Sequence, residues 1–229
     1  MANYPRYAIY YTAAPGSALD RFGASLLGYD AYGGDELPFP DGLPADWREL
    51  TQDPRKYGFH ATLKAPIALA EGRTEAQVAA ACRLFAEMAR PVPVIQPIVD
   101  SISGFIAVIP AEPSAELEVL AAEATKAFEP FRAPLSAEDR ARRNPDRLTP
   151  RQREYLDRWG YPYVFEQFRF HMTLTGRLPA ERREPVVAML RERFAATGIG
   201  PLAIDAIALC RQENPNSRFR VIGRWPLQE

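Results

Sequence analysis

The sequence predicts a mixed α/β (α+β) protein that is built from two lobes of similar design. The pattern Phe-His-x-Thr-Leu occurs twice, at residues 59–63 and at residues 170–174. After each copy, one helical pattern and then two strand patterns follow in the same order, and a repeated order of this kind indicates a duplicated unit. The 229 residues, 47% of them hydrophobic, can bury a full core. We therefore expect a single bilobal domain in which two facing lobes bring the two motifs together.

The first sixty residues contain one strand, one helix and a long loop before the first motif. Residues 6–12 (RYAIYYT) are rich in β-forming residues and predict a strand. Pro15, Gly16 and Ser17 open an amphipathic helix that runs to about Leu27. A loop rich in Gly, Pro and Asp covers residues 28–46, and residues 59–63 predict the strand that carries the first histidine.

The repeated elements follow each motif with different loops. In the first repeat, about 55–110, a helix is expected at 74–90 with Thr74 as its N-cap, followed by strands at about 94–102 and 104–109. A further helix is expected at 114–128. In the second repeat, about 166–229, the pattern predicts a strand at 168–175, a helix at 179–198 that Gly198 closes, and strands at 201–210 and 218–225.

Composition limits the classes of partner and the compartment. Lys and Arg number 28 against 29 acidic residues, so the net charge is −1, whereas a protein of long nucleic acids usually has a basic excess. Cys82 and Cys210 are the only cysteines, too few for a disulfide framework or a cysteine zinc site. No signal peptide and no membrane-spanning apolar stretch is visible. We expect a cytoplasmic protein, monomeric and without a membrane partner.

Side-chain alternation on the predicted strands places the polar residues of each motif on one face. His60 points with Thr62, and His171 points with Thr173, because residues two apart on a strand share a face. The other face of each strand is apolar and must pack on helices. The shared face therefore presents two imidazoles and two hydroxyls, and buried polar groups need partners that a ligand can provide.

A single histidine beside a threonine is more often a structural residue than a catalytic one, but the recurrence of the pair in the same frame favours a site. A zinc centre would need three or four ligands, and the chain has only two histidines and two cysteines. There is no Gly-x-Ser-x-Gly elbow and no Gly-rich phosphate loop. We therefore expect no metal and no cofactor.

The residues HATL at 60–63 and HMTL at 171–174 resemble the two-histidine (2H) phosphoesterase superfamily, which is defined by two His-x-Thr motifs. The resemblance implies a bilobal, pseudo-symmetric fold whose antiparallel sheets flank a central cleft. The context RKYGFHATLKAP and the arginine-rich segment before the second motif look like a subgroup encoded beside phosphonate-degradation genes.

The resemblance implies a metal-independent cyclic phosphodiesterase. His60 and His171 would serve as general acid and general base, because imidazole titrates near pH 6.5 and can hold or release a proton at neutrality. Thr62 and Thr173 would donate hydrogen bonds to the phosphoryl oxygens. The pseudo-symmetry leaves open which histidine is the acid, and a rate maximum with limbs on either side of neutrality is expected.

Flanking residues are candidates for substrate binding. Lys64 and Thr175 hold the same position after each motif, so both could point with the histidines, although a solvated strand end is an equally good interpretation. Tyr57 could close over a sugar ring or belong to the core. Arg55, Lys56 and Arg169 are near enough in sequence to assist.

An arginine-rich insertion at about 129–165 interrupts the repeat just before the second motif. Thr149 and Pro150 start a short helix within it, and Gly160 ends that helix. Such a charged helix is usually a solvated face. It could also cap the cleft and offer Arg142, Arg143 and Arg151 to a second phosphate group.

The expected substrate is a small phosphorylated molecule with a cyclic phosphate, and 5-phosphoribosyl 1,2-cyclic phosphate of phosphonate metabolism fits the subgroup. Alternatives are an RNA-end-processing 2′,3′-cyclic phosphodiesterase or ligase, and a non-catalytic RNA-binding module. The near-zero net charge and the absence of an evident aromatic stacking pattern count against RNA.

Overall fold

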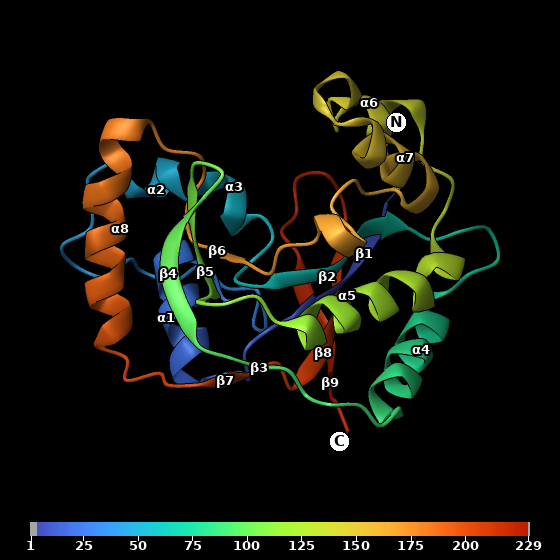
Figure 1. Cartoon of the computed structure of the whole chain (residues 1–229), viewed down its shortest axis with the longest axis horizontal. Coiled ribbons are helices and arrows are strands. Elements are labelled where there is room, and N and C mark those ends of the chain that lie inside the picture. Colours follow the sequence, from blue (N-terminus) through green and yellow to red (C-terminus); the bar gives the residue numbers. More distant parts are fainter. Residues whose placement is uncertain (1–3, 229) are drawn as a thin grey trace.

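Two antiparallel sheets form the centre of the molecule, for which a computed structural model describes residues 4–228 (Figure 1). The first sheet has the strand order β2-β1-β8-β9, with β1 at Arg6–Tyr11, β2 at Ala61–Ala68, β8 at Ala206–Gln212 and β9 at Arg220–Pro226. The second has the order β4-β5-β6, with β4 at Pro97–Ile102, β5 at Phe105–Pro110 and β6 at Met172–Thr173. The first motif enters the first sheet and the second motif enters the second sheet.

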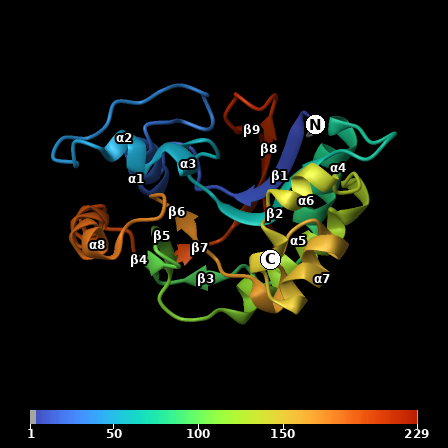
Figure 2. The same cartoon turned by 90° about the horizontal axis from the view of Figure 1, so that it is seen from above.

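Helices cover the outer sides of the sheets (Figures 1 and 2). Helices α4 (Glu75–Glu87) and α5 (Ala115–Ala127) contact the first sheet, and α8 (Ala180–Ala195) contacts β4 and β5 of the second. Helix α1 (Ala18–Leu27) joins the core through Phe22, whose ring centroid lies 5.2 Å from that of Phe194 on α8. Helices α2 (Trp47–Leu50) and α3 (Gln52–Arg55) precede the first motif.

The strand pairs that end each repeat are exchanged between the two sheets. The hairpin β4–β5, which follows the first motif in sequence, pairs with β6 of the second motif. The hairpin β8–β9, which follows the second motif, pairs with β1 of the first sheet. The short strands β3 (Val94–Ile95) and β7 (Leu202–Ala203) pair where the two chain segments cross. Each lobe therefore contains strands from both repeats rather than from one.

The predicted order of strand, helix, strand and strand is present after each motif, and the mixed α/β class with antiparallel sheets is confirmed. Ser17, Thr74 and Thr149 cap α1, α4 and α7 (Pro150–Trp159) through their side-chain oxygens, as the sequence predicts. The strand expected at 168–175 is reduced to two residues, because the 3₁₀ turn η3 (Phe165–Gln167) and irregular backbone lead into it. The helix expected at 179–198 ends at Ala195.

The insertion folds as a set of short helices beside the first sheet (Figure 2). After the 3₁₀ turn η1 (Glu129–Phe131) come α6 (Ala137–Ala141), the 3₁₀ turn η2 (Pro145–Arg147) and α7. A bridge between Leu69 and Arg132 ties the start of the insertion to the chain that leaves β2. Within residues 4–228, no helix has the length and apolar character needed to cross a bilayer.

Candidate active site

His60 lies directly before β2, and its ring is held by the backbone. Its Nδ1 is 2.9 Å from the carbonyl oxygen of Gly58, and its Nε2 is 3.3 Å from Oγ1 of Thr62. A carbonyl oxygen only accepts, so Nδ1 carries the proton and donates it. Nε2 of the neutral ring then accepts from the Thr62 hydroxyl and holds the lone pair that a base needs. Gly58 has φ 74°, and a Cβ at this position would lie 2.7 Å from Cβ of Ala31, so glycine is required here.

His171 is held in the same way on the other side of the site. Its Nδ1 is 2.7 Å from the carbonyl oxygen of Arg169, two residues earlier, as Gly58 is two residues before His60. The ring of Phe105 packs against it at a centroid distance of 5.3 Å. Both imidazoles therefore have Nδ1 bound to the backbone and Nε2 available for chemistry.

Thr62 of the first motif and His171 of the second line one cavity of about 250 Å³, which we call the first cavity, together with Lys64; His60 is not among its lining residues. Burial, with a smaller contribution from the charge of His171, lowers the pKa of His60 to about 4, although the backbone hydrogen bond to Gly58 opposes the shift. Burial also lowers the pKa of His171. Both rings are therefore neutral at pH 7 in the free protein.

Thr173 does not line the first cavity, in contrast to Thr62. It is half-buried on β6, where it pairs with Ala107 of β5. Its proposed hydrogen bond to a phosphoryl oxygen stays a prediction from the motif.

Four aromatic side chains, which we call the aromatic wall, also line the first cavity. Trp159, Tyr161, Tyr163 and Phe165 come from the end of the insertion and line the cavity with His171. These residues were not predicted from the sequence, because the insertion was interpreted as a charged segment that provides arginines for phosphate binding. The signal was present in the run WGYPYVFEQF at 159–168, where five of ten residues are aromatic.

Lys64 lines the first cavity but its charge already has a partner. Its side chain is 3% exposed, and Nζ lies 2.6 Å from Oε2 of Glu129 and 3.2 Å from the carbonyl oxygen of Thr125. Burial lowers the pKa of this ammonium group, and the hydrogen bond and charge of Glu129 act against that shift. Lys64 thus brings a neutralised pair to the cavity wall rather than a free cation.

Thr175 does not take the predicted substrate-binding position. It is fully buried, its Oγ1 accepts from the backbone N–H of Ile106 at 3.1 Å, and it donates to the carbonyl oxygen of Gly176 at 2.9 Å. Because both functions of the hydroxyl are used, we assign Thr175 a structural role. The strand ends at Thr173, so the alternation that would have pointed Thr175 with His171 does not extend to it.

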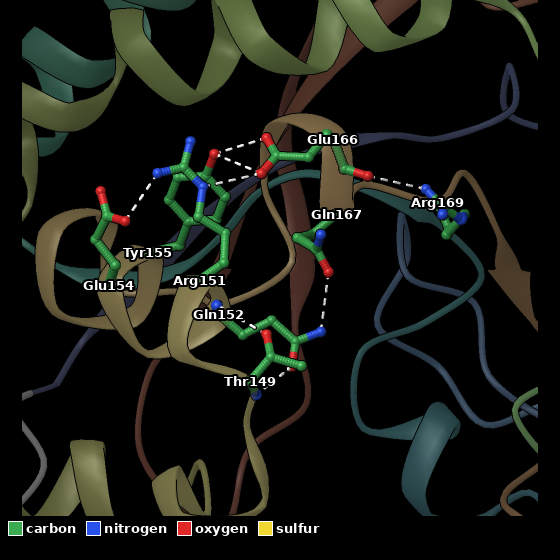
Figure 3. Close-up of polar contacts among 8 residues, drawn as sticks. All are labelled: Thr149, Arg151, Gln152, Glu154, Tyr155, Glu166, Gln167 and Arg169. Carbon is green, nitrogen blue, oxygen red and sulfur yellow. Dashed lines mark hydrogen bonds and ion pairs between the residues drawn. The ribbon is translucent and has the colours of Figure 1, made fainter.

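The three arginines of the insertion that were predicted to bind substrate have different partners. Arg151 lies outside both cavities, with Nη1 2.8 Å from Glu154 and Nε 3.0 Å from Glu166, so it is not placed to bind substrate (Figure 3). Arg142 is paired with Asp139 at 2.9 Å. Arg143 has its guanidinium over the ring of Tyr161, 5.2 Å from the centroid.

Arg142 and Arg143 line a second cavity of about 260 Å³, together with Tyr57. Tyr57 is half-buried rather than part of the core, and it stacks on Phe219 with a centroid distance of 5.4 Å. Its ring centroid is 6.1 Å from that of His60, so Tyr57 stands between the first motif and the second cavity.

Tyr10 supports the ring of His60, and this contact leads to a prediction. The two rings are stacked with centroids 3.8 Å apart, whereas the buried hydroxyl of Tyr10 has no hydrogen-bond partner within residues 4–228. We expect Tyr10→Phe to keep kcat and to raise the free energy of unfolding by up to about 1 kcal/mol, because it removes an unsatisfied polar group. Tyr10→Leu should lower kcat, since it removes the ring. Urea unfolding and steady-state kinetics of both variants check this, and a clearly destabilised Phe variant would contradict it.

A family model described as "Protein of unknown function (DUF1045)" matches residues 62–220, which include the second motif and begin two residues after His60. The chain belongs to the DUF1045 family. Two curated proteins resemble this DUF1045 chain, both named "Ribose 1,5-bisphosphate phosphokinase PhnN". The one from Janthinobacterium sp. (strain Marseille) is 36% identical over 93% of the chain and 49% of its own length. The one from Laribacter hongkongensis (strain HLHK9) is 36% identical over 94% of the chain and 50% of its own length. The DUF1045 chain thus spans about half the length of these relatives.

Solved structures similar to this DUF1045 protein include E. coli LigT and a phosphoesterase. E. coli LigT complexed with 3′-AMP has a TM-score of 0.42 at 12% identity, with 98% of this chain and 99% of that chain covered. A crystal structure described as a phosphoesterase has a TM-score of 0.44 at 12% identity, with 99% and 100% covered. At TM-scores this low, the ligands of those proteins say nothing about the substrate of the DUF1045 chain.

Proposed function

We propose that this protein is a metal-independent phosphodiesterase that hydrolyses a small cyclic phosphate. The observation that carries the proposal is the matched state of the two histidines. Each has Nδ1 bound to a backbone carbonyl oxygen, and each belongs to a motif that borders the first cavity. Two imidazoles whose Nε2 atoms are not bound to the backbone are the groups that an acid and a base of phosphodiester hydrolysis require.

In the proposed reaction, Nε2 of one histidine takes a proton from water as the water oxygen attacks phosphorus. Nε2 of the other gives its proton to the ester oxygen as the bond from phosphorus to that oxygen breaks, so the ring opens to a phosphate monoester. In the free protein the Thr62 hydroxyl lies 3.3 Å from Nε2 of His60, and on binding it would turn to donate to a phosphoryl oxygen instead. The acid must be charged, and the bound phosphate anion would raise the pKa of the imidazole beside it.

The finer proposal is that the substrate is 5-phosphoribosyl 1,2-cyclic phosphate of phosphonate metabolism. It is supported by the motif context and by the relatives, whose printed name contains a phosphorylated ribose. Their kinase activity is not extended to this chain, because it covers about half of them and has no Gly-rich phosphate loop.

One observation favours a second candidate, an RNA-end-processing 2′,3′-cyclic phosphodiesterase. The aromatic wall of Trp159, Tyr161, Tyr163 and Phe165 offers flat surfaces on which a nucleobase can stack. A bare sugar phosphate does not need such a wall.

A turnover screen tests the proposal and separates the candidates. Purified protein is incubated with 5-phosphoribosyl 1,2-cyclic phosphate, 2′,3′-cyclic nucleotides and RNA with a cyclic end, each with and without EDTA. We expect the phosphorylated sugar to have the highest kcat/KM and EDTA to have no effect. A higher value for cyclic-ended RNA would favour the second candidate, and activity restored by zinc after chelation would refute the metal-free mechanism.

The shifted pKa values predict an acidic optimum for kcat/KM. The free enzyme needs one neutral and one protonated histidine, and burial lowers the pKa of His60 to about 4 and that of His171 below its usual value. The rate should therefore fall as pH drops through about 4 and again as pH rises through the pKa of the other ring. The maximum of kcat should lie at higher pH, because bound phosphate raises these pKa values. Profiles measured with 2′,3′-cyclic UMP check this, and a kcat/KM maximum above pH 8 would contradict it.

A further inference from the structure

The second cavity is lined by an excess of cations. Arg6 at the start of β1, Lys56 after α3 and Arg143 after α6 meet there with Arg132 and Arg142. Asp139 is the carboxylate among the described lining residues. A concave site in which five cations face one carboxylate favours an anionic ligand.

Two of these cations already have carboxylate partners. Arg132 binds Oε1 of Glu129 through Nε and Nη2 at 3.0 and 2.6 Å. Arg142 lies 2.9 Å from Asp139. Neither guanidinium can therefore give its full charge to a ligand.

The other three cations have only neutral partners within residues 4–228. Arg6 donates through Nε to the side-chain oxygen of Gln212 at 3.0 Å, and Lys56 donates to the carbonyl oxygen of Pro215 at 3.0 Å. Arg143 stacks on Tyr161. Two guanidinium groups and an ammonium group without carboxylates match the oxygen-rich shape of a phosphate monoester, which accepts several charge-assisted hydrogen bonds.

The second cavity adjoins the first through two tyrosines. Tyr57 lines the second cavity and lies 6.1 Å from the ring of His60. Tyr161 lines the first cavity and lies under the guanidinium of Arg143. A single small molecule with one phosphorus group at the histidines can thus reach the cations with a second group.

We propose that the second cavity binds a phosphate monoester of the substrate through Arg6, Lys56 and Arg143, so that the enzyme selects cyclic phosphates with a second phosphate. This rests on the proposed function for the identity of the first phosphate. The proposal differs from the sequence prediction, which assigned the second phosphate to Arg142, Arg143 and Arg151. Of these only Arg143 is retained, since Arg151 is outside the cavity and Arg142 is paired with a carboxylate.

A binding experiment tests this site without turnover. Ribose 5-phosphate is titrated by calorimetry into a His60→Ala/His171→Ala double variant, and then into the same variant with Arg143→Ala or Lys56→Ala added. We expect each addition to weaken binding at least about tenfold, as the loss of one charge-assisted contact implies. Arg151→Ala, a change of the same type in the same insertion, should leave affinity unchanged. No binding to the double variant, or equal affinities for all variants, would overturn the proposal.

A kinetic experiment then separates failure of this site from failure of the proposed function. Arg143→Ala should raise KM for 5-phosphoribosyl 1,2-cyclic phosphate about tenfold and change KM for ribose 1,2-cyclic phosphate less than about twofold. An equal rise for both substrates would overturn the site. If wild type turns over no cyclic phosphate while the titration succeeds, the proposed reaction is wrong and the anion site stands. A 2′,3′-cyclic nucleotide with and without a 5′-phosphate shows whether the second phosphate belongs to a sugar or to a nucleotide.

Discussion

Alanine at His60 or at His171 is expected to lower kcat by about 10²–10⁴-fold, the range that a general acid or base contributes. In each ring Nδ1 is bound to a backbone carbonyl oxygen, so Nε2 is the atom that exchanges protons with the substrate. Alanine removes this atom, and the motif has no second imidazole to replace it. Since the two histidines act in one step, the double variant should be scarcely slower than either single variant. Steady-state kinetics on the best substrate of the screen measure this.

Folding of these variants is checked by circular dichroism and thermal unfolding. Protein groups surround both rings closely enough to lower their pKa values, yet both side chains keep intermediate solvent exposure, so the loss of either should change the unfolding free energy by no more than about 1 kcal/mol. Arg151→Ala is a control for an exposed change outside both cavities. Activity within threefold of wild type in either histidine variant, with the fold intact, would refute the two-histidine mechanism.

Glu129→Gln is expected to lower the free energy of unfolding by about 2–4 kcal/mol, which is the second large effect. The variant leaves the ammonium group of Lys64, 3% exposed, without its counter-charge, and an unpaired buried charge typically costs about 3–5 kcal/mol. We expect a cost about 1 kcal/mol below that range because Glu129 is 24% exposed and its charge is partly screened by solvent. Burial already lowers the pKa of Lys64, and without Glu129 it falls further below its unfolded value, so the loss should shrink as pH rises toward that unfolded value. Urea unfolding at pH 7 and at pH 9.5 measures both effects.

Two matched variants make this result specific. Lys64→Met/Glu129→Gln should recover much of the lost stability, since an apolar side chain can replace a buried charge of similar length. Asp157→Asn breaks an ion pair with Arg140 whose side chains are 52% and 42% exposed, and it should cost less than about 1 kcal/mol. Equal costs for Glu129→Gln and Asp157→Asn would contradict the burial argument.

The order of the elements and the first motif could be predicted from sequence because both depend on local patterns. Thr74 and Thr149 start helices through hydrogen bonds to residues three positions on, and these pairs are visible in the sequence. The alternation that joins His60 to Thr62 is also local, and the two side chains are in contact.

Features that depend on distant residues could not be predicted. Arg143 and Arg151 both lie in the arginine-rich insertion, and the sequence does not distinguish them. In the structure Arg151 forms ion pairs with Glu154 and Glu166, which keep its guanidinium from a ligand. The role of Thr175 depends on its contact with Ile106, a residue of the other repeat. The exchange of hairpins between the two sheets could not be predicted either. An alternating pattern shows which face of a strand is buried, but it does not show which strand lies next to it.

The exchange of hairpins also has a consequence for biosynthesis. Strand β1 leaves the ribosome well before β8, which is one of its two neighbours, and Arg6 binds a residue 206 positions later in the chain. Until β8 is synthesised, the edge of β1 that later pairs with it has no partner. Unpaired strand edges promote aggregation. Contacts of such long sequence separation also make folding slow. The first sheet can therefore be completed only after β8 has been synthesised, a delay that two consecutive lobes would not impose.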